Sequence, residues 1–266
     1  MTDTTARLRN LRTWNVGVGV VHLVQGIAIL ALSTSFSIAI VATVQTGPPG
    51  APGSLSVSRT FFDFGFAIAI ALFLFLAAAD HLLMAAPRIK DWYEQNLLRG
   101  INIARWVEYS ISASIMILLI ALLNGINNLY ALMAIFGVNA SMILFGLVME
   151  KVNIGRDEVT WWPFTFGCIA GIVPWIAIVF ALVTAATDNT MINGVPANPD
   201  GVPPFVYGIV ISLFALFNCF ALNQWLQYRK RGRFADYLYG EKVYLVLSLV
   251  AKSALAWQIF AGTLAA

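Results

Sequence analysis

The chain has 266 residues, of which 59% are hydrophobic and only 11% are charged. A soluble domain carries about 25% charged residues, so this composition, with a mean hydropathy of +0.79, excludes an ordinary soluble protein and indicates an integral membrane protein. The two cysteines, Cys168 and Cys219, lie in apolar segments and indicate packing residues rather than a disulfide or a metal site.

Seven apolar segments are long enough to cross a hydrocarbon core of about 30 Å as helices. Turns rich in Gly, Pro, Asn and Asp separate them. We expect one all-α membrane domain over residues 1–266, a bundle of seven transmembrane helices. The loops at 46–58 and 188–203 are long enough for structure of their own, and the first is a candidate for a short hairpin. The expected spans are 14–44, 61–86, 102–124, 128–149, 160–187, 204–228 and 241–264.

The basic residues are sharply partitioned between the two ends of these spans. Thirteen of the sixteen Lys and Arg residues lie on one side, and the other side has only Arg59. By the positive-inside rule the N-terminus is cytoplasmic, and seven crossings place the C-terminus outside. We therefore expect a multi-pass protein of the cell membrane, with the lipid bilayer and not nucleic acid as its partner. The thirteen are Arg7, Arg9, Arg12, Arg88, Lys90, Arg99, Lys151, Arg156, Arg229, Lys230, Arg231, Arg233 and Lys242.

One of the remaining basic residues lies in the middle of the last span, within SLVAKSALAW (248–257). At 1.5 Å per residue, Lys252 is about 15 Å from the inner end of its span, and Glu108 and His22 lie at nearly the same depth on two co-oriented spans. An unpaired charge there would cost from about 2.5 to more than about 10 kcal/mol, so Lys252 needs a partner. Glu108 is the intramembrane carboxylate at matching depth.

Two interpretations of this lysine and carboxylate follow from their chemistry. In the first, they form a structural ion pair between the third and seventh spans, as in a transporter. Alternatively, the desolvated amine of Lys252 is a nucleophile that condenses with an aldehyde to a Schiff base. The protonated Schiff base would then need a carboxylate counter-ion, which Glu108 would supply.

Seven spans with these two residues resemble the retinal-binding rhodopsins. The pump-type microbial rhodopsins differ: they have an aspartate one turn before the lysine, where this chain has Ser248, and they place the N-terminus outside. Over essentially its whole length the chain instead resembles the heliorhodopsins. The residues that carry this resemblance are RWVEYS (105–110), His22, Gln25, His81, Asn139, Glu150, Gln224 and SLVAKSALAW.

The resemblance implies that Lys252 binds all-trans retinal as a protonated Schiff base and that Glu108 is its counter-ion. Ser248 and Ser112 are candidates to hydrogen-bond the Schiff base or the carboxylate, although a serine in a transmembrane helix often bonds its own i−4 carbonyl instead. Ordinary aromatic packing is the alternative for the residues expected at the polyene. These residues are Tyr109, Asn139, Met142, Gly146, Trp175, Phe217, Gln224 and Trp257.

The two histidines of the chain, His22 and His81, lie within spans, where histidine usually faces water. The resemblance places them in a hydrated cavity that serves the proton chemistry of the Schiff base. A metal site formed with Asp80 is a weaker alternative. We expect Arg105 to stabilise this cavity or to pair with Glu150 or Asp80. The expected proton network consists of His22, Gln25, Asp80, His81, Arg105 and Glu150.

The distribution of ionisable groups favours a light sensor over an ion pump or an enzyme. The inner half of the bundle has titratable groups, whereas the outer half has only Asp63 beyond the lysine. Proton transport across the membrane would need such groups on both sides. We therefore expect a photoreceptor without net ion transport, and a light-gated or light-driven proton conductor is the alternative. The resemblance also implies a homodimer, and the 150–158 and 229–233 loops could meet a cytoplasmic signalling partner or anionic lipid.

Overall fold

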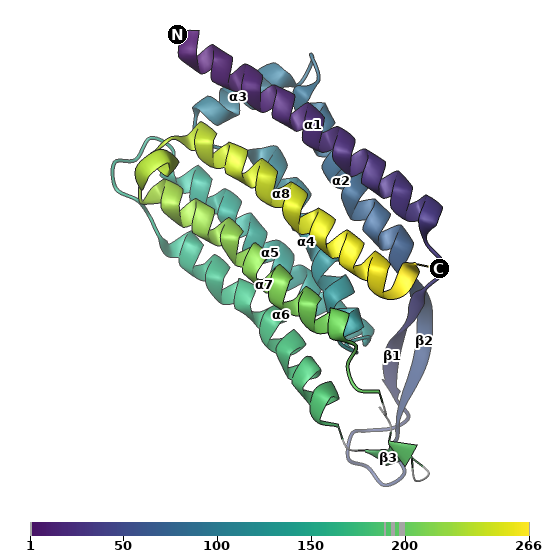
Figure 1. The fold of residues 1–266 in the computed structure, drawn as a ribbon. Coiled ribbons are helices and arrows are strands. Elements are labelled where there is room, and N and C mark those ends of the chain that lie inside the picture. Colours follow the sequence, from purple (N-terminus) through teal and green to yellow (C-terminus); the bar gives the residue numbers. More distant parts are fainter. Residues whose placement is uncertain (1, 189, 193–194, 197–199, 266) are drawn as a thin grey trace.

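The computed structural model describes residues 2–188, 190–192, 195–196 and 200–265. In this part of the chain, seven helices are long and apolar enough to cross a membrane, and they form one bundle (Figure 1). They are α1 (Thr2–Leu32), α2 (Phe66–Ala85), α4 (Ile103–Leu123), α5 (Leu129–Asn153), α6 (Trp162–Thr187), α7 (Pro204–Tyr228) and α8 (Tyr237–Ile259), which a π-helical turn (Phe260–Leu264) extends. The seven-helix membrane fold predicted from hydropathy is thereby confirmed.

The helices form a chain of neighbours around the bundle. Helix α1 packs against α2 and α8, α4 packs against α2 and α5, α6 packs against α5, and α7 packs against α8. The two termini lie at opposite ends of the bundle, as an odd number of crossings requires (Figure 1). The short helix α3 (Lys90–Leu98) lies at the same end as the N-terminus, in the connection between α2 and α4.

Apolar side chains fill the interior of the bundle and also cover its outside. Phe66, Ile120 and Leu255, from three different helices, are fully buried and belong to one cluster of buried apolar residues. Phe180 and Ile211 are each 70% exposed and point outward. Large apolar residues on the outer faces of the long helices suit contact with lipid, because the hydrocarbon core of the bilayer contains no water and exposed apolar side chains carry no cost there.

The first span differs from its prediction at both ends. Helix α1 begins at Thr2 and ends at Leu32, not 14 and 44, and β1 (Ser37–Gln45) follows it. This strand pairs antiparallel with β2 (Ser56–Gly65), with a bulge between Ile40 and Val41, so α2 begins at Phe66 rather than 61. Hydropathy does not distinguish a strand rich in β-branched residues from a helix, which explains the error.

The hairpin expected within 46–58 is therefore larger and spans 37–65. It is tied to the turn between α4 and α5, since Val41 N–H donates to the Asn127 carbonyl over 3.0 Å and the Asn127 side chain donates to the Ala39 carbonyl over 3.0 Å. In the second long loop, β3 (Met191–Ile192) pairs with β4 (Val195–Pro196). The loop residues 189, 193–194 and 197–199 lie outside the described part of the chain.

The other spans lie within five residues of their predicted limits. Side-chain caps account for several of the starts: Asn102, Asn128 and Asp236 each accept a hydrogen bond from a backbone N–H in the first turn of α4, α5 and α8. Such caps satisfy donors that the helix leaves free. Because Asp236 provides this cap, α8 begins at Tyr237, one turn before the predicted 241.

Candidate functional site

The centre of the bundle holds a buried ion pair between α8 and α4. Nζ of Lys252 lies 3.2 Å from Oε2 of Glu108, and both side chains are at most 6% exposed. Nζ also donates to Oγ of Ser248 over 3.0 Å, one turn earlier on α8. The ring of Tyr109 lies beneath the amine, 4.7 Å from Nζ to the ring centroid. The amine therefore sits between a carboxylate, a hydroxyl and an aromatic face, which together stabilise its positive charge.

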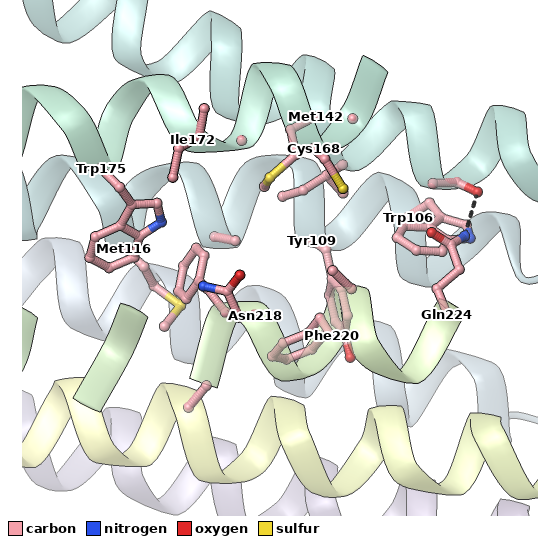
Figure 2. A pocket seen from close by; sticks show the side chains of 18 of the residues that line it. Trp106, Tyr109, Met116, Met142, Cys168, Ile172, Trp175, Asn218, Phe220 and Gln224 are labelled. Atoms are coloured by element: carbon pink, nitrogen blue, oxygen red, sulfur yellow. Dashed lines mark hydrogen bonds between the residues drawn. The ribbon is translucent and has the colours of Figure 1, made fainter. Parts of the chain in front are cut away.

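An apolar cavity of about 190 Å³ adjoins Lys252 and runs between α4, α5, α6, α7 and α8. Figure 2 shows Trp175 and Met116 at one end of the cavity and Trp106 and Gln224 at the other, with Tyr109 and Phe220 between them. Its lining is mostly aromatic and aliphatic, and its polar side chains include those of Ser112, Asn218, Gln224, Ser248 and Lys252. The cavity is thus suited to an elongated apolar ligand that reacts with an amine at one point.

Two glycines let side chains from neighbouring helices enter the cavity wall. A Cβ on Gly146 would overlap the Trp106 ring, and a Cβ on Gly171 would overlap the Sδ of Met142. The side chain of Gln224 donates to the Gly146 carbonyl over 3.1 Å, so α7 holds the backbone of α5 at the same point (Figure 2). Glycine at these positions sets the width of the cavity.

Most of the side chains predicted to contact a polyene do line this cavity. Those in the lining are Tyr109, Ser112, Met142, Gly146, Trp175, Phe217, Gln224, Ser248 and Lys252. Ser112 is fully buried, and its hydroxyl has no hydrogen-bond partner within the described chain.

Two of the predicted contacts lie elsewhere. Asn139 donates to Oγ of Ser114 over 3.0 Å and is outside the lining. Trp257 is 37% exposed and turns toward α1, where its indole N–H donates to Oε1 of Gln25 over 3.3 Å. The family resemblance placed Trp257 at the polyene, but Trp257 lies five residues after Lys252, and five residues along a helix rotate a side chain well away from the starting face.

The two histidines lie together on the α1 side of the ion pair. The rings of His22 and His81 are stacked with centroids 5.8 Å apart and an angle of 10° between their planes. His81 Nδ1 lies 3.0 Å from Oδ1 of Asn15. Both nitrogens of His22 and Nε2 of His81 are buried without a hydrogen-bond partner in the described structure. Asn15 was not among the residues predicted for this site, although its position seven residues before His22 places it on the same helix face.

Asp80 is half-buried on α2 next to His81 and forms none of the ion pairs in the part of the chain that the structure describes. Within that part, no group of three or more His, Cys, Asp or Glu residues is arranged to hold a metal ion. The alternative of a metal site formed by Asp80 and the two histidines therefore has no support in the structure.

Nearer the end of the bundle at which the N-terminus lies (Figure 1), Arg105 pairs with two carboxylates. Its guanidinium lies 2.5 Å from Oε1 of Glu150 and also donates to Glu241. All three side chains are at most 4% exposed. The guanidinium also lies over the Tyr244 ring, 3.8 Å from its centroid. Of the two partners expected for Arg105, Glu150 is the one it contacts, and Asp80 is not.

The carboxylates of this cluster are fully hydrogen-bonded. Glu150 accepts from the Trp106 indole over 2.6 Å, from the Tyr237 hydroxyl over 3.1 Å and from the Asn102 backbone N–H over 2.9 Å. Glu241 also accepts from the Asn102 side chain over 2.8 Å. No role was assigned to Glu241 from the sequence, although it is the first residue of the predicted span 241–264 and lies eleven residues before Lys252. Three helical turns therefore place both on one face of α8.

A seven-helix membrane bundle with a buried lysine, a paired carboxylate and an apolar cavity beside the amine defines a protein of the retinal-binding rhodopsin class. The family model of the heliorhodopsins matches residues 11–264 of the chain. The chain therefore belongs to the heliorhodopsin family, a family of light-responsive membrane proteins with a retinal chromophore, as its resemblance to these proteins predicted. A comparison with curated proteins gives no match.

The residues of the site fit a retinal. An aldehyde can reach only a nucleophile that opens into its cavity, and Lys252 is part of the cavity wall. Trp106, Tyr109 and Trp175 supply flat apolar surfaces along the walls. Glu108, 3.2 Å from the amine, supplies the negative charge that a cationic linkage at this nitrogen requires.

Proposed function

We propose that this heliorhodopsin is a light-sensing photoreceptor that carries out no net ion transport. All-trans retinal, bound to Lys252 as a protonated Schiff base, supplies light absorption and isomerisation. The single observation that carries the proposal is the buried pair of Lys252 and Glu108, with 3.2 Å between Nζ and Oε2, at the wall of an apolar cavity. The roles of the surrounding residues follow from their contacts with this pair.

Glu108 is the counter-ion in this proposal, because it is the carboxylate in contact with the amine. Ser248 orients the same nitrogen, since its hydroxyl lies 3.0 Å away. Tyr109 stabilises the positive charge through its ring face and is itself held by a hydrogen bond from its hydroxyl to the Tyr244 carbonyl, 3.1 Å long. These three residues keep the charged nitrogen at one place in the cavity.

The histidine pair and the Arg105 cluster form the inner polar network of the proposal. His22 and His81 have free ring nitrogens within the described structure and can take up a proton released near Lys252. Arg105, Glu150 and Glu241 lie between the histidines and the inner end of the bundle. Their ion pairs block the route of a proton to that end. A proton that leaves the site is then kept on the inner side and within the protein.

The outer half of the bundle supports a sensor rather than a pump. Beyond Glu108 and Lys252, α4 and α8 contribute Ile117, Ile120, Leu255 and Ile259 to the main apolar cluster, and each of the four is fully buried. Apolar packing of this kind offers a proton no hydrogen-bonded path. Loss of the charge on Lys252 after illumination would instead weaken its attraction to Glu108 and change the balance of forces between α4 and α8.

The charge distribution supports an inside-N orientation for the proposal. Thirteen basic residues lie at the end of the bundle that holds the N-terminus, so the N-terminus would be cytoplasmic and the C-terminus extracellular. A homodimer and a cytoplasmic signalling partner complete the proposed arrangement. Crosslinking in membranes tests the dimer, and labelling of a cysteine introduced at exposed Leu55 of the hairpin in intact cells tests the orientation.

Recording from cells tests the central claim. Cells that express the protein with all-trans retinal are illuminated while photocurrent and external pH are measured. We expect a visible absorption band and light-induced changes of that band, with no sustained current and no lasting pH change. A sustained photocurrent would replace the sensor by the proton conductor, and a colourless protein would favour a transporter that uses Lys252 and Glu108 as a structural pair.

A further inference from the structure

The inner half of the bundle holds a hydrogen-bonded path that leaves the histidine pair and ends on α3. Asn15 of α1 is its central member. Its Oδ1 lies 3.0 Å from Nδ1 of His81, and its Nδ2 lies 3.3 Å from the hydroxyl of Tyr93. Asn15, His81 and Tyr93 are 1%, 3% and 5% exposed. Three elements, α1, α2 and α3, are thus joined by two buried side-chain hydrogen bonds.

The contacts of Asn15 determine which ring nitrogen of His81 carries the proton. Nδ2 of Asn15 also lies 3.1 Å from the Leu11 carbonyl, which only accepts hydrogen bonds. The atom facing Leu11 is therefore the amide nitrogen, and the atom facing His81 is the oxygen. An oxygen that only accepts requires a donor opposite it, so Nδ1 of His81 carries a hydrogen.

Neutral His81 then has no proton on Nε2. This nitrogen is buried and has no hydrogen-bond partner in the described chain, and the ring to which it belongs is stacked on His22. Nε2 is accordingly the atom at which His81 can gain a proton. When it does, the bond from Nδ1–H to Asn15 becomes charge-assisted, and such bonds are shorter and roughly twice as strong as neutral ones.

Tyr93 connects Asn15 to a helix outside the spans. Its ring packs in a cluster with Leu8, Leu11 and Leu97, so a shift of its hydroxyl is transmitted to neighbours on α1 and α3. Burial raises the pKa of Tyr93 to about 12. Tyr93 therefore stays a neutral phenol near pH 7, and what passes through it is a change of position and hydrogen bonding.

We propose that Asn15 is a positioning residue that keeps His81 in the Nδ1–H form and passes a change in His81 protonation through Tyr93 to α3. This inference rests on the proposed function, in which the histidine pair receives the proton, and it identifies the element that responds. Helix α3 suits this part because it lies at the end of the bundle near the N-terminus (Figure 1). Its Trp92 and Leu98 side chains are 45% and 59% exposed.

The dark state tests the positioning role. The chain has only two histidines, so nitrogen NMR of ring-labelled protein in lipid resolves them, with a His22→Phe variant for assignment. We expect His81 in the wild type to be protonated at Nδ1 and not at Nε2. Asn15→Leu removes the acceptor and should yield a mixture of the two forms, whereas Asn10→Leu, at an exposed site of the same helix, should leave His81 unchanged. A wild-type His81 protonated only at Nε2 would overturn the assignment.

Hydrogen exchange under illumination tests the transmission. We expect light to change the exchange rate of the amides in 90–98 several-fold in the wild type. Tyr93→Phe keeps the ring and removes the hydroxyl that Asn15 contacts, and it should abolish this change while the visible band remains. Tyr130→Phe, at a 55% exposed tyrosine, is the control and should behave as the wild type.

The remaining outcomes of these measurements separate the transmission from the proposed function. An unchanged light response of 90–98 in Tyr93→Phe, or a wild type with a visible band but no response there, would overturn the transmission. A wild type that forms no band with retinal would overturn the proposed function and the transmission with it. The dark measurement of His81 would still decide the role of Asn15, and Tyr93→Phe decides the transmission even where Asn15→Leu does not fold.

Discussion

Nζ of Lys252 and Oε2 of Glu108 lie 3.2 Å apart across the α8–α4 contact, in side chains that are at most 6% exposed. The two residues are 144 positions apart in the chain. A buried lysine with one carboxylate partner is costly to maintain by itself, because desolvation of both charges offsets most of their attraction. Its presence at the wall of a cavity therefore indicates chemistry at the amine, and the first two predictions address the two members of the pair.

Lys252→Ala should abolish the visible band of protein expressed with all-trans retinal. The reason is that the variant removes the only amine in the lining of the described cavity. Absorption spectra of purified wild type and variant provide the measurement. Lys151→Ala, which changes an exposed lysine, is the matched control and should keep the band; a variant at Lys252 that retains it would show that another group binds the chromophore.

Glu108→Gln should shift the visible band to longer wavelength. A negative charge beside the bound nitrogen stabilises the ground state more than the excited state, in which positive charge moves along the polyene away from Glu108. Removal of this charge therefore narrows the gap. The absorption maximum is compared with that of Glu158→Gln, a change at an exposed glutamate that should leave it in place. An unshifted maximum in Glu108→Gln would assign the counter-ion to another residue.

Gly146→Ala adds only one methyl group, but it should both destabilise the protein and hinder the binding of retinal in the cavity. Its Cβ would overlap the Trp106 ring, and overpacking of this kind costs about 1–3 kcal/mol. We expect a lower melting temperature and slower or weaker uptake of retinal, followed by the growth of the visible band. Gly137→Ala on the same helix has no atom within 4 Å of the added Cβ and should be neutral or slightly stabilising. Equal behaviour of the two variants would remove Gly146 from the wall.

Arg105→Leu should reduce the free energy of unfolding by about 3–5 kcal/mol, because it leaves Glu150 and Glu241 buried without their cation. Replacing the cluster as a whole, with Arg105→Leu, Glu150→Gln and Glu241→Leu together, should cost less than the single change. Denaturation in detergent measures both.

Arg99→Leu, at an exposed arginine, is the control for this cluster and should change stability by no more than about 0.5 kcal/mol. If Arg105→Leu were equally mild, the ion pairs would contribute little to the fold. The role of the cluster would then lie in the candidate functional site and not in the stability of the fold.

Local properties of the sequence were enough to predict the number of spans, the approximate limits of every span except the first, and the depth of Lys252, Glu108 and His22. Hydropathy reports whether a segment suits lipid, and a rise of 1.5 Å per residue converts chain position into depth. The family resemblance also came from the sequence, through the residues around Glu108 and Lys252. These features do not depend on which helices are neighbours.

The tertiary structure decided which faces of the helices meet. A helix in lipid is apolar on every side, so its sequence does not show which face turns inward. For this reason Glu241 was not assigned to Arg105, Asn15 was not assigned to His81, and Trp257 was placed in the cavity although it turns toward Gln25. The strand at 37–45 was taken for helix on the same grounds, because apolar composition alone contains no information about the hydrogen-bond partner across the hairpin.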